Sequence, residues 1–109
     1  MMRSNELQQR MSHVEQTVHH AAERCQTATT LPMDLKDSIQ ELDQRVMQAR
    51  QTMQSNDESQ VRQCIEDLEQ MGDRAKDACE HAPNLDSELR DAIMQAHREL
   101  SDMKHQFLH

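Results

Sequence analysis

The sequence has almost no aromatic residues, with no Trp, no Tyr and a single Phe at position 107 among 109 residues. Its core must therefore be built from Leu, Ile, Val, Met, Ala and Cys, a set that suits helices better than sheets. One Gly and two Pro leave little material for turns, so the connections must be few and short. These absences favour an all-α fold.

Long hydrophobic runs are also lacking. No stretch approaches the roughly 20 apolar residues that cross a bilayer, and no apolar segment of a signal peptide follows the first residues. We therefore expect a cytoplasmic protein with no membrane partner. The three cysteines, an odd number, fit a reducing compartment with free thiols better than a disulfide framework.

Positive charge is scarce relative to negative charge, and the net charge is −8 at pH 7 with His neutral. An acidic surface repels phosphate backbones, so nucleic acid is not an expected partner. Residues 57–91 contain eleven acids and four bases. We interpret this segment as a solvated face that aids solubility, in preference to a dedicated site for a basic partner.

What the chain does contain is heptad spacing. In four segments, apolar residues alternate at intervals of four and three, which is the a/d pattern of coiled coils and antiparallel bundles. The pattern predicts four helices. The predicted core residues are Leu7, Met11, Val14, Val18, Ala21, Cys25 and Ala28; Leu35, Ile39, Leu42, Val46, Ala49 and Met53; Val61, Ile65, Leu68, Gly72, Ala75, Cys79 and Ala82; Leu89, Ile93, Ala96, Leu100, Met103 and Phe107.

Residues that favour helix ends lie between these segments. We expect Ser4 to cap the first helix and Pro32 to lie in the first turn of the second. A capping box of Ser55 and Glu58 is expected at the third helix, where Asp57 is also favourable. Pro83 should stop the third helix, with a cap for the fourth from Asn84 or Asp86.

The two halves of the chain align without a gap when shifted by 54 residues. The shift matches polar positions that heptad spacing does not force, together with two cysteines. The matched pairs include Glu15/Glu69, Cys25/Cys79, Lys36/Arg90 and Asp37/Asp91. We infer a duplicated helical hairpin, about 4–54 and 57–108, that forms one domain over 1–109. Because the connections are short, the predicted fold is an antiparallel up-down-up-down four-helix bundle.

No catalytic pattern is recognisable in the sequence. It contains no Gly-rich loop and no nucleophile–base pairing, and a packed seam of side chains leaves no pocket. No a or d position carries the inward Glu or Glu-x-x-His of a di-iron bundle, and no inward pair of haem ligands is present. We therefore expect a protein that is not an enzyme and holds no cofactor.

Cysteine and histidine are the residues that suggest a metal site. Cys25, Cys79 and Cys64 are the residues of an alternative soft-metal site, although two buried hydrophobes and one half-exposed thiol are the simpler interpretation. The seven histidines project outward or sideways in the heptad register and are interpreted as solvated. Glu15 and His19, four residues apart, are suited to hold a surface ion only weakly. No metal is expected.

The third helix carries additional apolar residues beside its seam. Cys64, Met71 and Ala78 lie seven apart and widen its apolar face. With Val61 they form the predicted contact surface for a protein partner or a homodimer. The expected exposure of Met47 and Met94 adds adaptable apolar surface. The favoured hypothesis is a small, acidic protein that acts by protein–protein interaction. A thiol- or His-based metal-binding protein and a purely structural scaffold remain alternatives.

Overall fold

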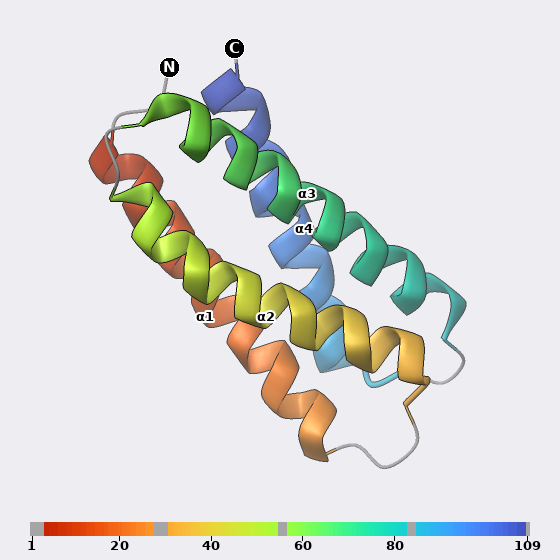
Figure 1. Cartoon of the computed structure of the whole chain (residues 1–109). Helices are drawn as coiled ribbons and strands as arrows, with labels where there is room; N and C mark the ends of the chain where they lie inside the picture. Colours follow the sequence, from red (N-terminus) through yellow and green to blue (C-terminus); the bar gives the residue numbers. More distant parts are fainter. Residues whose placement is uncertain (1–3, 28–30, 55–56, 83–84, 109) are drawn as a thin grey trace.

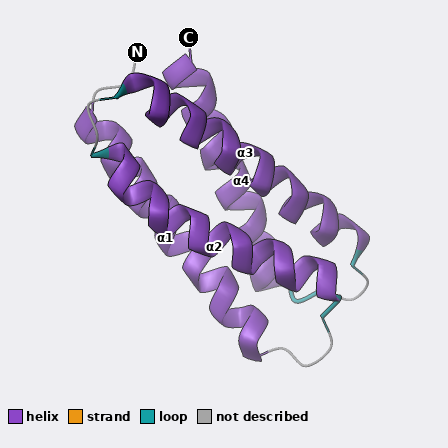
Figure 2. Cartoon of the chain, in the orientation of Figure 1, coloured by secondary structure: helices purple, strands orange, loops and turns teal. Residues whose placement is uncertain are grey.

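Heptad spacing organises the chain into four long helices, seen in a computed structural model that describes residues 4–27, 31–54, 57–82 and 85–108. The helices are α1 (Ser4–Thr27), α2 (Met33–Met53), α3 (Glu58–His81) and α4 (Ser87–Leu108). The described ranges contain no strand (Figures 1 and 2). The prediction of an all-α four-helix bundle is confirmed.

The helices form a ring in which each packs on two others. Backbone contacts join α1 to α2, α2 to α3, α3 to α4 and α4 to α1, and in the described residues no Cα atoms of a diagonal pair approach within 8 Å. Side-chain contacts join the beginning of α1 to the end of α4 (Arg10 to Gln106) and the end of α1 to the residue before α4 (Arg24 to Asp86). These contacts are consistent with the up-down order, which, like the duplication, remains an inference from the sequence.

The core consists of the residues at the a and d positions. Every one of them in the described ranges is buried, while Ala28 lies outside those ranges. Ala22 and Ala92, beside the seam, are buried as well. No polar or charged side chain of the described residues is fully buried. The apolar stripe therefore predicts the core residue by residue.

The helix ends differ in part from the prediction. Asp57 is the N-cap of α3, where its Oδ1 accepts hydrogen bonds from the N–H groups of Ser59 (3.0 Å) and Gln60 (3.3 Å). Glu58 is thus the first helical residue and not the third, so it does not fit the expected capping box, whose Ser55 lies outside the described residues.

The other expected ends are found close to their predicted places. Asp86 accepts a hydrogen bond from the N–H of Leu89 (3.3 Å), as expected of a cap for α4. Pro32 is the N-cap of α2 and so comes one position before the predicted first turn. Ser4 is the first residue assigned to α1, while Pro83 and Asn84 lie outside the described residues.

The single glycine of the sequence, Gly72, lies on the face of α3 that packs against α4. A Cβ atom added at Gly72 would lie 3.2 Å from Leu100 Cδ1 and 3.9 Å from the Cα of His97. The absence of a side chain therefore leaves room for Leu100 at this level of the α3–α4 seam. Within the described ranges, no helix is both long enough and apolar enough to cross a lipid bilayer.

Candidate functional site

A continuous groove runs along the seam between α2 and α3. It consists of three shallow hollows, and neighbouring hollows share lining residues. Cys64 lines the first hollow, Met71 the second and Ala78 the third. We call this surface the α2–α3 groove. The three residues that the sequence singled out beside the α3 seam thus each occupy a hollow of the same groove.

The floor of the groove is continuous with the core. Cys64, Met71 and Ala78 are half-buried and pack against the core cluster. Val61, which was predicted to belong to the same contact surface, is only 5% exposed and is a core residue. It therefore offers almost no surface to a partner.

The rims of the groove are polar. Arg45 of α2 reaches across to Asp67 of α3, with Nη2 and Oδ2 3.2 Å apart, and Gln63 donates a hydrogen bond to Asp67 Oδ1 (3.1 Å). Besides this pair, the first two hollows are lined by four uncharged glutamines and by Glu41, Thr52 and Arg74. The glutamines are Gln44, Gln48, Gln60 and Gln70. An apolar floor between polar rims is the geometry of a recognition groove for an amphipathic segment.

Two methionines outside the groove behave differently from each other. Met47 is 54% exposed, as predicted. Met94 is half-buried and packs on the core, so the prediction of its exposure is wrong. Heptad position alone does not distinguish them, because an unbranched side chain can fold back onto the core from the edge of a helix.

The cysteines are free and do not come together. Cys25 on α1 and Cys79 on α3 are buried on diagonal helices whose Cα atoms remain more than 8 Å apart, beyond the separation that a disulfide spans. Cys64 is half-buried in the α2–α3 groove. The geometry therefore provides no shared site for the thiol-based alternative.

Burial also makes these thiols poor ligands and nucleophiles. It raises the pKa of Cys25, Cys64 and Cys79 above the ordinary value. Arg90 opposes this shift at Cys79, and Arg45 opposes it at Cys64, where Asp67 adds to it. The thiolate is the reactive form, so raised pKa values reduce reactivity near neutral pH.

Thiol titration provides a direct test of these environments. With an aromatic disulfide reagent, we expect the native protein to expose one slowly reacting thiol, Cys64, and the denatured protein to expose all three. A Cys64→Ser variant should lose the native reaction. Rapid native reaction of Cys25 or Cys79 would contradict the buried placement.

Most described histidines pair with carboxylates on a neighbouring helix, although the sequence suggested solvated side chains. His13 pairs with Glu99 and His20 with Glu88 between α1 and α4, while His19 pairs with Asp43 between α1 and α2. Between α3 and α4, His97 pairs with Asp73. The His97 side chain is only 19% exposed, against 58% for His19, so it does not fit the solvated interpretation.

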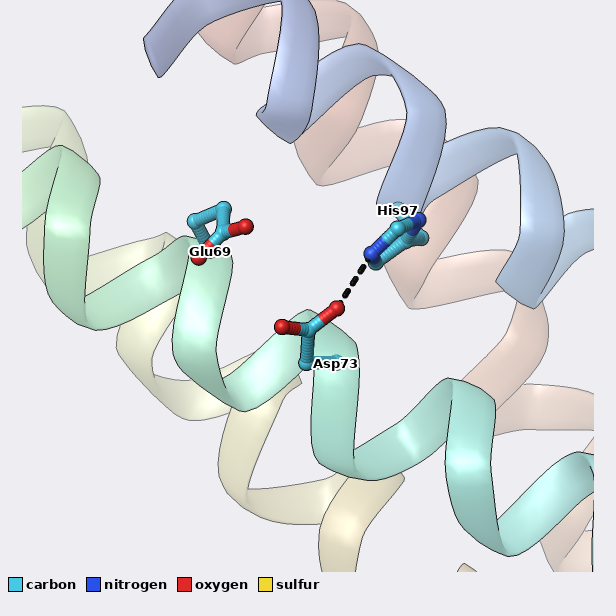
Figure 3. A group of neighbouring side chains, drawn as sticks. All are labelled: Glu69, Asp73 and His97. Atoms are coloured by element: carbon cyan, nitrogen blue, oxygen red, sulfur yellow. Dashed lines mark hydrogen bonds and ion pairs between the residues drawn. The ribbon is translucent and has the colours of Figure 1, made fainter.

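The pair formed by His97 belongs to a cluster of three potential metal ligands. Figure 3 shows Asp73 and His97 pointing toward one another, with Glu69 one turn earlier on α3. His97 Nε2 lies 2.5 Å from Asp73 Oδ1, and one ligand atom from each of the three residues lies within 4.8 Å of the others. Lys104 of α4 lies 3.6 Å from Glu69 Oε2.

Sequence reasoning missed this cluster. A signal was present: Glu69 and Asp73 are four residues apart, which places both carboxylates on one helix face. The heptad register, however, assigns a helix face to each residue without saying which partner it meets across a seam. The contact with His97 therefore required the packed structure.

Comparison with known proteins gives no relative from which a function can be transferred. No protein-family model matches the chain, and no curated protein or solved structure matches it significantly. A four-helix bundle supports many unrelated functions, so the fold alone assigns none. Functional proposals must therefore be argued from the α2–α3 groove and the histidine–carboxylate cluster.

Proposed function

We propose that the protein acts by binding an amphipathic helix of another protein in the α2–α3 groove. The observation that carries the proposal is the spacing of the three hollows. Their floor residues, Cys64, Met71 and Ala78, lie seven residues apart on one helix, which is about 10.5 Å per interval at 1.5 Å per residue. A docked helix with apolar residues at heptad spacing would present one anchor to each hollow.

The groove can admit such a helix without unfolding the bundle. Met71 at its centre is flexible and adapts to differently shaped anchors. The Arg45–Asp67 pair crosses the groove, but Arg45 is 49% exposed and Asp67 34% exposed. Exposed ion pairs contribute about 0–1 kcal/mol, so displacing this one would cost little.

The charge of the protein favours a partner with basic edges. The chain carries a net charge of −8, and the groove is lined by four acids, Asp34, Glu41, Asp67 and Asp77, against two arginines, Arg45 and Arg74. Long-range repulsion between two copies with the same net charge disfavours a homodimer. A basic amphipathic helix would be attracted by the same field. Such a role requires no catalytic group, and the three free thiols favour a reducing, cytoplasmic setting.

Two methionine substitutions test the proposal. We expect Met71→Glu to abolish binding of the partner, because it places a charge on the floor of the groove where the apolar anchor would dock. Met47→Glu is the matched control, because Met47 is exposed on α2 and does not line the groove. The measurement is native mass spectrometry of complexes recovered from the source cells, followed by titration with the helix identified in the partner.

Both variants should keep the helical circular dichroism of the parent protein. Retention of the partner by Met71→Glu, or its equal loss in both variants, would contradict the proposal. A homodimer that survives Met47→Glu and dissociates on Met71→Glu would replace the partner helix with a second copy of the chain.

A further inference from the structure

We propose that Glu69, Asp73 and His97 form a binding site for a divalent transition-metal ion of the Zn²⁺ class, between α3 and α4. The site is separate from the α2–α3 groove, and the proposal does not depend on the proposed function. One imidazole and two carboxylates form a ligand set of the kind used by open metal sites, in which water completes the coordination.

The geometry requires only a small adjustment. Ligands that are about 2.0–2.2 Å from one ion lie about 2.8–3.6 Å from one another in octahedral or tetrahedral arrangements. His97 Nε2 and Asp73 Oδ1 are already 2.5 Å apart, and Glu69 offers an oxygen within 4.8 Å of both. A slight opening of the first pair and a rotation of Glu69 would therefore create the site.

The backbone holds these ligands in place. Glu69 and Asp73 lie one turn apart on α3, and His97 faces them from α4 (Figure 3). Gly72, between the two carboxylates in sequence, faces α4 near His97, whose Cα would lie 3.9 Å from a Cβ atom added there. Ligands on two packed helices lose little conformational freedom on binding, which favours affinity.

The first hairpin contains two corresponding pairwise contacts, although His19 also pairs with Glu23 on its own helix (3.1 Å). At positions 54 residues earlier, Glu15, His19, Asp43 and Arg50 correspond to Glu69, Asp73, His97 and Lys104. Glu15 pairs with Arg50 (3.4 Å) as Glu69 pairs with Lys104, and His19 meets Asp43 (3.5 Å) as Asp73 meets His97. The imidazole and the aspartate have exchanged helices, but the chemistry of the set is unchanged.

The first set also contains oxygens suited to a cation. Glu15 Oε2 and Asp43 Oδ1 are buried and, apart from their ion pairs with Arg50 and His19, have no hydrogen-bond partner. However, His19 is 58% exposed, and the first set does not bring three ligand atoms together. Among the described residues, the group whose three ligand atoms lie within 4.8 Å of one another is Glu69, Asp73 and His97. The second set, with its largely buried imidazole, is therefore the stronger site, and His19 supplies a matched control for it.

Lys104 is the one described cation that competes directly for a ligand. Its ammonium group lies 3.6 Å from Glu69 Oε2, and its side chain is 39% exposed, so it can turn into solvent when a metal binds. Removal of this charge should therefore strengthen metal binding. If the His97–Asp73 pair had a purely structural role, removal of the Lys104 charge would not strengthen metal binding.

The test is titration of the untagged, chelator-treated, full-length protein with Zn²⁺ by calorimetry and with Co²⁺ by absorption spectroscopy. We expect one site of higher affinity and a cobalt spectrum without a thiolate charge-transfer band. Mutating a residue that only hydrogen-bonds to a metal ligand typically lowers metal affinity about 10- to 100-fold. Loss of a ligand itself should therefore weaken binding at least tenfold. His97→Gln and Asp73→Asn should each show this loss, and Lys104→Gln should bind more tightly than the parent.

His19→Gln, in the equivalent pair of the first hairpin, should leave the higher-affinity site intact. Unchanged affinity in both His97→Gln and Asp73→Asn would overturn the proposal, as would equal loss in His97→Gln and His19→Gln. A thiolate band in the cobalt spectrum would overturn it in favour of the cysteines. Because two variants report on the ligands, the misfolding of one, detected by circular dichroism, leaves the proposal testable.

Discussion

Replacement of Val46 by Asp should destabilise the fold by about 4–5 kcal/mol at pH 7, close to the whole stability of many domains of this size. Val46 has no exposed surface, and no polar or charged side chain in the described ranges is fully buried, so the carboxylate would enter an apolar core without an established partner. Such burial raises a carboxyl pKa by up to about 3–5 units, and each unit corresponds to 1.36 kcal/mol.

The sign of the pH dependence identifies the mechanism. Because the folded-state pKa of the introduced Asp would lie above its unfolded value, the penalty for burying its charge is present at neutral pH and disappears as the pH falls toward about 4. The cost of placing a neutral carboxyl group in the core remains. The measurement is urea unfolding of Val46→Asp at pH 7 and pH 5. Val46→Thr, which has the same shape with one hydroxyl, is the control, and its deficit should not change with pH. A pH-independent deficit in Val46→Asp would contradict burial of the charge.

Replacement of Leu100 by Ala should destabilise the protein by about 4 kcal/mol, toward the upper end of the 2–5 kcal/mol range for such truncations. Leu100 is fully buried, and its Cδ1 occupies the space beside Gly72. Gly72 has no side chain that can move into the resulting cavity. The loss should appear as a lower urea midpoint with an unchanged slope.

The double variant tests this explanation. In the parent protein, Gly72→Ala gains about 1 kcal/mol of helix propensity but places its Cβ 3.2 Å from Leu100 Cδ1, so these two effects oppose each other. In the Leu100→Ala background the close contact is absent, and Gly72→Ala should recover at least about 1 kcal/mol. Equal effects of Gly72→Ala in both backgrounds would mean that Leu100 does not fill this space.

The helices and the core were predictable because one physical requirement determines both. A helix must bury one face, and residues such as Val18, Ile65 and Leu100 mark that face at intervals of three and four. Helix ends were less predictable because several residues compete to cap them. Asp57, not Ser55 with Glu58, caps α3, since the helix begins two residues later than the expected box requires.

Contacts across the seams were the part that sequence reasoning did not predict. The register placed His97 at the side of its helix, but its partner depends on how α3 and α4 pack against each other. Val61 and Met94 show the same limit for apolar residues. The sequence placed Val61 both in the core and in the contact surface, and packing decides for the core. Met94 lies outside the a/d stripe, and packing leaves it half-buried.

The ring order of the helices has a consequence for how fast the protein folds. Three of its four seams join helices that follow one another in the chain, so most native contacts are local and the contact order is low. Domains of this kind fold in microseconds to milliseconds. The α1–α4 seam joins residues as far apart in sequence as Arg10 and Gln106, which are separated by 96 positions. Forming it closes nearly the whole chain into a loop, which costs more conformational entropy than forming the other seams. We therefore expect that seam to form late, so that mutations there mainly accelerate unfolding.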